Sequence, residues 1–209
     1  MKKAEIFLYS LFAIGIMLKL FKLPLHTIFI LASLLIIIIY YISCLIRKNK
    51  DLYSTITGFV TVLWLFGLLA VLKHFPFRDI VLTIAVLSSI VWLFILYKNK
   101  KLKSANIIFC SLIIFITIIF RFLPAHNTYY LTNIKFNYEI EIDYRSWDKY
   151  SWFLYAEGKE EEALQANQKA QSAIEKYMQN PNHGDKNEYL SIIKEHHLAI
   201  KNKSWVKYP

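Results

Sequence analysis

Three short stretches of the chain place basic side chains and imidazoles around a proline: "KLPLHT" ending at Thr27, "HFPFRD" ending at Asp79 and "FLPAHN" ending at Asn127. Lysine, arginine and protonated histidine bind phosphates and carboxylates through charge-assisted hydrogen bonds. Two interpretations are open, headgroup anchoring or docking of an anionic lipid or an acidic partner segment. The stretches predict an outer basic patch made of Lys22, His26, Lys73, His74, Arg78, Arg121 and His126.

Residues able to catalyse a reaction or hold a metal are few. The chain has no G-x-S-x-G, H-E-x-x-H, C-x-x-C, P-loop or dinucleotide fingerprint. His196 and His197 are adjacent, so on a helix they point about 100° apart, which is poor geometry for one metal. The run "EGKEEEA" stands at an expected helix start, where acids stabilise the dipole. We therefore predict no enzymatic activity, no metal site and no cofactor.

The elements that carry these residues are expected to cross a membrane. Of the 209 residues, 56% are apolar and 16% aromatic, which exceeds the composition of an ordinary soluble domain. Each of five apolar runs is close to the roughly 20 residues that span a bilayer as a helix. We predict an α-helical polytopic membrane protein with five transmembrane helices within residues 1–124, at about 5–23, 25–46, 53–74, 78–97 and 104–123.

Charge predicts the orientation. Residues 1–124 hold 14 Lys and Arg against three Asp and Glu, whereas residues 125–209 hold 11 against 12. The basic surplus flanks the apolar runs, which argues against nucleic-acid binding. Nine of those 14 basic residues fall on one side of the predicted spans and five on the other. The positive-inside rule therefore places the N-terminus in the cytoplasm of a bacterial inner membrane and residues 125–209 in the periplasm.

The first four runs read as two tandem hairpins followed by one further helix. Gly15 and Pro24 recur as Gly67 and Pro76, at the same offset of 52 residues. Proline lacks an N–H and restrains the residue before it, so each proline is expected to end the outgoing helix. Thr27 and Asp79 are then expected to cap the returning helices.

These turns resemble those of the GldL-type membrane proteins of gliding bacteria, which are related to gliding motility and type IX secretion and turn near F-K-x-x-H-W-P-G. "FKLPLHT" and "LKHFPFRD" keep the basic residue and the proline, and "KHFP" also keeps the histidine. The resemblance covers residues 1–125 and implies a subunit of a transport, secretion or energy-transducing complex. GldL-type motor subunits carry a glutamate in the second helix, but "TIFILASLLIIIIYYISCLI" has no acid. We expect no buried Asp or Glu in any span.

The segment after the spans, residues 125–145, is predicted to be an extended or β arm. In "NIKFNYEIEIDY" apolar and polar residues alternate, a period-two pattern typical of a strand with one buried face. No second strand is evident in the chain to pair with it. The arm is expected either to pack on the following helices or to pair with another protein or a second copy.

Residues 146–209 are predicted to form a periplasmic helical domain. Residues 146–181 resemble a tetratricopeptide hairpin, with Trp147, Gly158, Ala163, Ala170 and Pro181 near the signature places of that repeat. Ser146 is expected to cap its first helix and Gly158 to permit its turn. A third helix should cap the hairpin with Tyr189, Ile192, Ile193 and Ile200 inward. Repeats of this type bind peptides or protein partners.

The leading prediction is a non-enzymatic inner-membrane scaffold or adaptor that presents a small periplasmic module. The alternative is a subunit of a membrane transport, secretion or energy-transducing complex. Expected partners are membrane lipids and another envelope protein or a second copy, with no nucleic acid and no small-molecule substrate. The candidate partner-binding residues are Ile134, Phe136, Tyr138, Ile140, Ile142, Trp147, Trp152 and Tyr155.

Overall fold

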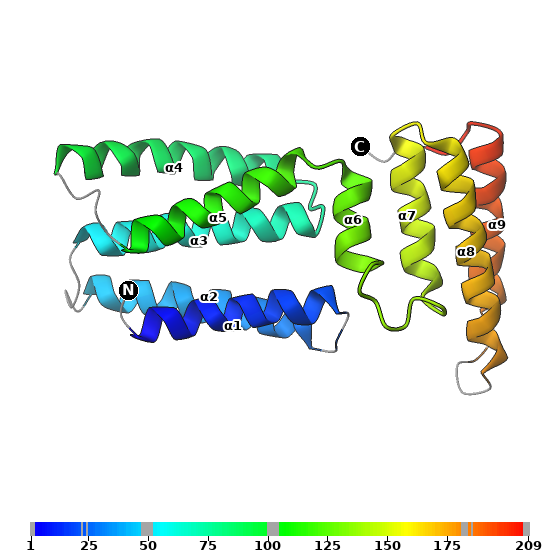
Figure 1. Ribbon diagram of the computed structural model, residues 1–209, viewed down its shortest axis with the longest axis horizontal. Helices are drawn as coiled ribbons and strands as arrows, with labels where there is room; N and C mark the ends of the chain where they lie inside the picture. The colour runs from blue at the N-terminus through cyan, green and yellow to red at the C-terminus, as the bar shows by residue number, and fades with distance from the viewer. Residues whose placement is uncertain are drawn as a thin grey trace. The chain divides into compact units, whose positions relative to one another are not determined.

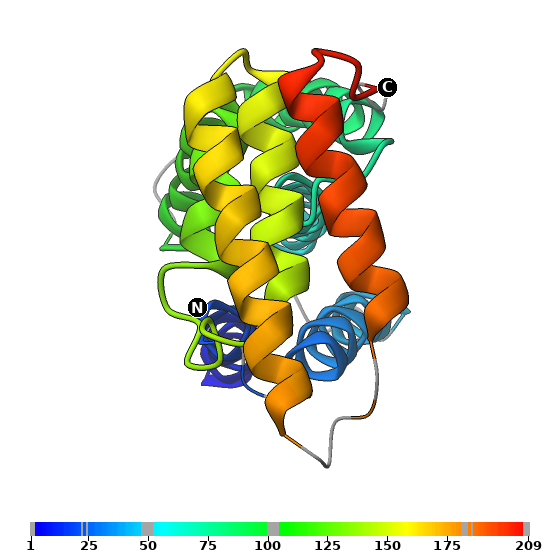
Figure 2. The same cartoon turned by 90° about the vertical axis from the view of Figure 1, so that its right-hand side faces the viewer.

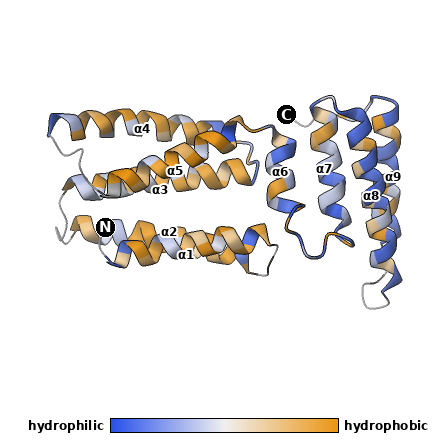
Figure 3. Cartoon of the chain, in the orientation of Figure 1, coloured by the Kyte–Doolittle hydropathy of each residue, from blue (hydrophilic) through white to orange (hydrophobic). Residues whose placement is uncertain are grey.

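The computed structural model describes residues 3–21, 23, 25–46, 52–99, 105–180, 184 and 186–206. Within these ranges the regular structure is entirely helical and contains no strand (Figure 1). The chain divides into two compact units. The first unit comprises residues 1–19 and 23–123, and the second unit comprises residues 20–22 and 124–209. Figure 3 shows hydrophobic residues dominating the helices of the first unit and a mixture of hydrophilic and hydrophobic residues along those of the second.

The helices of the first unit are α1 (Lys3–Leu20), α2 (His26–Ile46), α3 (Leu52–Leu72), α4 (Arg78–Lys98) and α5 (Ala105–Phe122). Three of them, α2, α3 and α4, are long and apolar enough to cross a membrane. A fourth span exists if α5 and the following α6 (Ala125–Asn133), which meet at a bend of 114°, count as one. The described residues thus support three or four spans rather than the predicted five. Helix α1 falls short because its 18 residues include Lys3, Glu5 and Lys19.

Helix α3 is the centre of the first unit. In its most apolar stretch 78% of the residues are buried within the protein, against 33% for α2 and 22% for α4. It packs against α2, α4 and α5, and its Trp64 and Leu65 are almost fully buried. A helix that is apolar all round is expected at such a central position, while its neighbours expose one face.

The two hairpins share a contact that fits the predicted duplication. A Cβ on Gly15 would lie 2.8 Å from Ile30, and a Cβ on Gly67 would lie 3.1 Å from Leu82. Ile30 and Leu82 are separated by the same 52 residues as the two glycines. In both hairpins, the glycine therefore allows the returning helix to approach closely at the same place.

The second unit contains α6, α7 (Tyr144–Ala156), α8 (Glu160–Gln179) and α9 (Asn187–Lys201), of which α7, α8 and α9 lie along one another (Figure 2). Helix α8 contacts both α7 and α9. Ala163 and Ala170 are completely buried, which lets the helix backbones approach, and Gly158 turns the chain with a φ of 81°. The prediction of which residues of the third helix face inward is confirmed for two of four. Ile193 and Ile200 are buried, whereas Tyr189 and Ile192 are more than one third exposed. Pro181 lies outside the described residues.

The predicted extended arm is wrong, because residues 134–142 form consecutive turns apart from Asn137. The buried Asn137 side chain donates to Asp143 Oδ2 at 2.7 Å and accepts from the backbone N–H of Glu139 at 3.0 Å. Such local side-chain bonds compete with extended structure and favour turns. Asp143 also caps α7 by accepting from the backbone N–H of Ser146 at 3.1 Å. The cap is therefore Asp143 and not the predicted Ser146.

Candidate functional site

Pro24 lies outside the described residues, whereas α3 and α5 end before Pro76 and Pro124 as expected. At the end of α3 the chain closes a Schellman motif. Phe75 N–H donates to Ala70 O at 3.0 Å, and His74 N–H donates to Val71 O at 3.1 Å, with His74 at a φ of 53°. The predicted N-caps are wrong. Thr27 lies inside α2 and Asp79 inside α4, whose N-cap position is Phe77 and receives no side-chain capping bond.

Asp79 instead organises two members of the predicted basic patch. Its Oδ1 lies 3.0 Å from Arg121 Nη2 and 3.9 Å from Arg78 Nε, so the two arginines from different helices converge on one carboxylate. Because the carboxylate of Asp79 is 63% exposed and binds a guanidinium, the pair partly neutralises this part of the patch. The expected single cationic surface is therefore interrupted by an acid.

The remaining basic residues of the predicted patch have different local environments. His26 Nδ1 lies 2.9 Å from the carbonyl oxygen of Leu23, in the turn that precedes α2. Lys73 and His74 are half-buried at the end of α3. Lys22 lies outside the described residues. His126 is only 5% exposed and belongs to the second unit, where its partners are Glu157 and Lys159.

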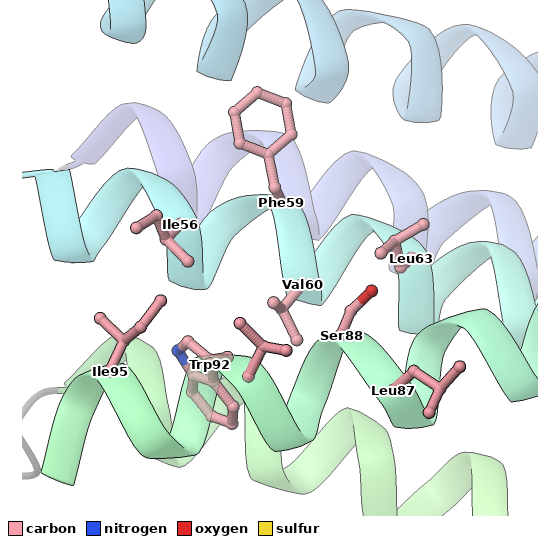
Figure 4. A pocket seen from close by; sticks show the side chains of 9 residues that line it. Ile56, Phe59, Val60, Leu63, Leu87, Ser88, Trp92 and Ile95 are labelled. Carbon is pink, nitrogen blue, oxygen red and sulfur yellow. The ribbon is translucent and has the colours of Figure 1, made fainter.

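Two grooves mark the surface of the first unit. One, of about 420 Å³, lies between α3 and α4, and its lining is apolar apart from Ser88 and the indole of Trp92 (Figure 4). That indole is already bound, since Trp92 Nε1 donates to Thr57 Oγ1 at 3.0 Å. The other groove, of about 470 Å³, is lined by α3, α4 and α5 and includes Asp79 and Arg121. Such grooves match acyl chains or apolar helices better than polar substrates.

A buried carboxylate in α1 was missed from the sequence. Glu5 is 2% exposed, and its Oε1 accepts a hydrogen bond of 2.8 Å from the hydroxyl of Tyr41 in α2. The Tyr41 hydroxyl also lies 2.7 Å from that of Tyr9, which is one turn after Glu5 on α1. The expectation that no span buries an acid is therefore wrong for the run at 5–23. The spacing of Glu5 and Tyr9, four residues apart on one helix face, is the signal that sequence reasoning could have used.

The beginning of the second unit is clamped to the turn between α7 and α8. Glu157, the C-cap residue of α7, accepts the backbone N–H of His126 at 3.1 Å through Oε1. The same carboxylate holds His126 Nδ1 through Oε2, and Lys159 Nζ lies 3.2 Å from Nε2. Lysine can only donate, so Nε2 accepts in this contact and Nδ1 is the nitrogen that donates to Glu157. Glu157 thus caps α6 from 31 residues away.

A polar network joins α7, α8 and α9. The completely buried Asn167 of α8 donates to the carbonyl oxygen of Ile193 at 3.1 Å and accepts from His197 Nδ1 at 3.1 Å. His196 Nδ1 lies 2.9 Å and 3.0 Å from the two carboxylate oxygens of Asp148 in α7. Burial, together with the nearby Lys201, lowers the pKa of His197, which favours its neutral, hydrogen-bonding form. The three helices are therefore fixed together by polar bonds as well as by apolar packing.

The candidate partner-binding residues have different environments. In the turns before α7, Phe136 and Tyr138 are 42% and 63% exposed, whereas Ile134 is buried and Ile140 and Ile142 are half-buried. On α7, Trp147 is half-buried and its Nε1 donates to Ile140 O at 3.0 Å. The neighbouring candidates Trp152 and Tyr155 both contact the segment that follows α9, with Trp152 Nε1 3.4 Å from Val206 O.

No group of histidine, cysteine, aspartate and glutamate in the described part of the chain could hold a metal ion. His196 and His197 have separate partners, Asp148 and Asn167, and so do not converge. No protein-family model matches the chain, and no significant similarity to a curated protein or to a solved structure is found.

Proposed function

We propose that the chain is a non-enzymatic scaffold or adaptor of a bacterial inner membrane, which presents residues 125–209 as a partner-binding module in the periplasm. The observation that carries the proposal is the construction of the second unit. Its α7, α8 and α9 are locked by the Asp148, Asn167, His196 and His197 bonds, while aromatic side chains of α7 lie beside the C-terminal segment. A rigid helical stack with an aromatic face is suited to binding a protein segment.

The proposal includes five membrane spans. Two of the three charges that separate α1 from an ordinary span are shielded, since Glu5 is 2% and Lys19 4% exposed within the protein, whereas Lys3, the first residue of the helix, is exposed. Charged side chains inside a membrane are tolerated when they face protein partners rather than lipid. With α1 and α5 both crossing, the positive-inside rule gives a cytoplasmic N-terminus and a periplasmic second unit.

The proposal is tested by copurification from native membranes in a mild detergent. The full chain is compared with a chain ending at Pro124 and with the full chain carrying Lys149→Ala, an exposed change on α7 that serves as control. A protein retained by the full chain and the control but lost from the truncated chain supports the adaptor. A complex that survives truncation contradicts it, because the contacts would then lie in the first unit.

A second candidate is a subunit of a transport or energy-transducing complex, as the resemblance to GldL-type proteins implies. The observation in its favour is the buried Glu5 and its bond to Tyr41, since an ionisable group inside a membrane bundle often serves in ion or proton movement. The test is ion flux in liposomes that contain the purified chain and a pH-sensitive dye. Flux that is present in the unaltered chain and lost in Glu5→Gln would favour this candidate over the adaptor.

A further inference from the structure

The described chain continues beyond α9 as an ordered segment. It reverses at a Schellman motif, in which Ser204 N–H donates to Ala199 O at 2.9 Å and Lys203 N–H donates to Ile200 O at 3.1 Å. Lys203 occupies the left-handed position, with a φ of 54°, where glycine is the usual residue. A lysine in the left-handed region is strained, so the contacts made by the following residues must offset that strain. We call residues 203–206 the tail.

The tail lies on side chains of all three helices. The Trp205 ring stacks on His196 of α9, with centroids 4.4 Å apart and planes at 24°, and lies 5.9 Å from the ring of Tyr155 of α7. Trp152 Nε1 of α7 donates to Val206 O at 3.4 Å. Lys203 Nζ lies 3.1 Å from Glu160 Oε2 at the start of α8. We call Trp152, Tyr155, Glu160 and His196 the tail-docking surface.

These contacts are of the kind by which a protein binds a separate extended peptide. An aromatic ring rests on two other rings, an indole N–H bonds a main-chain carbonyl, and a carboxylate pairs with a basic residue. Apart from the turn itself, none of them requires the tail to be attached to α9. They recognise a basic residue two positions before an aromatic one, and the backbone carbonyl of the residue that follows.

The polar contacts of the tail are weak enough to be exchanged, and the Trp205 ring, which packs against the buried cluster that includes Tyr155 and Ala163, is its main anchor. The ion pair is formed by a Lys203 side chain that is 70% exposed and a Glu160 side chain that is 41% exposed, and exposed pairs of this kind contribute little to stability. The indole bond is long, and Val206 is 73% exposed. Glu161 and Glu162 follow Glu160 in the first turn of α8, and Lys159 pairs with Glu162 at 3.3 Å, so Glu160 and Glu161 supply the acidic charge that complements a basic segment.

We propose that the tail-docking surface is the binding site for an extended segment of a separate envelope protein, with a basic residue two positions before an aromatic one. The tail fills the site when the partner is absent and competes with it. This inference rests on the proposed adaptor function and names the chemistry of its partner. A tethered tail has an effective concentration in the millimolar range, so the full chain should bind such a segment more weakly than a chain without the tail.

The test uses a fluorescein-labelled peptide of residues 202–206, Asn-Lys-Ser-Trp-Val, and fluorescence anisotropy in detergent. A chain ending at Asn202 should bind the peptide at least about tenfold more tightly than the full chain, because it lacks the competing tail. The same peptide with alanine in place of tryptophan should not bind. Within the shortened chain, Glu160→Gln should weaken binding, whereas Glu161→Gln, a matched loss of one exposed charge, should weaken it less.

A second variant allows the inference to be tested even if the shortened chain misfolds. Trp205→Ala in the full chain keeps the backbone of the tail and empties the place of the ring, so it should bind N-acetyltryptophanamide, which the unaltered chain should not. If neither variant binds its probe while both keep their helical circular dichroism, Trp205 belongs to the core and the inference is overturned. If the full chain is dimeric and becomes monomeric on removal of the tail, the occupant is a second copy, which also overturns a separate partner.

The failure of this inference and that of the adaptor function are distinguishable. If copurification requires residues 125–209 but the peptide does not bind, the proposed role of the tail-docking surface is refuted and the adaptor function still stands. The shortened chain could instead bind the peptide while the native complex survives truncation at Pro124. That result would refute the adaptor function, and because the proposed partner depends on that function, it would overturn this inference as well.

Discussion

The packing of Tyr41 on Gly58 gives a sharp prediction for the first unit. A Cβ on Gly58 would lie 2.5 Å from Tyr41 Cδ1 and closer still to Cε1 and Cζ. Gly58→Ala must therefore displace the ring, and with it the hydroxyl that bonds Glu5 and Tyr9. The mutation tests whether this close approach of ring and backbone holds the buried carboxylate in place.

The expected loss of stability follows from three effects. Overpacking costs about 1–3 kcal/mol, and the lost hydrogen bond to a buried carboxylate costs about 1.5–3 kcal/mol. Replacing glycine by alanine within a helix returns about 1 kcal/mol. The net loss is about 1.5–5 kcal/mol, which corresponds to a fall in Tm of roughly 3–20 °C for a chain of this size.

The assay is the fraction of purified full chain that stays monodisperse on size-exclusion chromatography after stepwise heating in detergent. Gly67→Ala is the matched control on the same helix, because its Cβ would meet only the flexible end of Leu82 at 3.1 Å. Its Tm should change by less than about 3 °C, since the helix propensity of alanine offsets the tight contact. Tyr41→Phe should lose about 1.5–3 kcal/mol without overpacking. Equal shifts for Gly58→Ala and Gly67→Ala would refute the packing of Tyr41 on Gly58.

Three further predictions concern the second unit. Asp143→Ala removes the N-cap of α7 and should lower the stability of the unit by about 1–2 kcal/mol in thermal unfolding, whereas loss of less than about 0.3 kcal/mol would contradict the cap. Glu157→Ala should speed amide hydrogen exchange in the first turn of α6 and leave that of α9 unchanged. Because the pKa of His197 is lowered from 6.5 on folding, its stabilisation is present above that value and is lost as the pH falls through the folded pKa. His197→Gln should flatten that part of the pH profile, and an unchanged profile would exclude His197 as its cause.

The sequence predicts the helices better than it predicts their contacts. Long apolar runs and the proline turns mark α2, α3 and α4, and Gly158 marks the turn between α7 and α8, because these signals depend on nearby residues only. The period-two run at residues 133–144 was misleading because it, too, is a signal that depends on nearby residues only. Its alternation predicts a strand, but the bonds of Asn137 to Asp143 and Glu139 favour turns.

The contacts that matter at the candidate sites join residues far apart in the chain. In the sequence, Glu5 is only one of three acidic residues within residues 1–124. The structure shows that Tyr41, 36 residues later, donates a hydrogen bond to it. His126 reads as one more member of a basic patch until Glu157 is found beside it. Asp79 reads as a helix cap, but Arg121 of another helix takes its carboxylate. In each case, the environment of the residue is determined by a partner that is distant in the sequence, which local sequence patterns do not identify.

The clamp at His126 also determines how mechanical load enters the second unit. The backbone passes from α5 into α6 at Pro124, and any tension on that connection first reaches residues bonded to Glu157 and Lys159. We expect such tension to load the bonds to Glu157 and Lys159, and through them the turn between α7 and α8, before α6 unwinds beyond His126. The start of α6 should therefore resist pulling along the chain better than a helix end held only by its own backbone bonds.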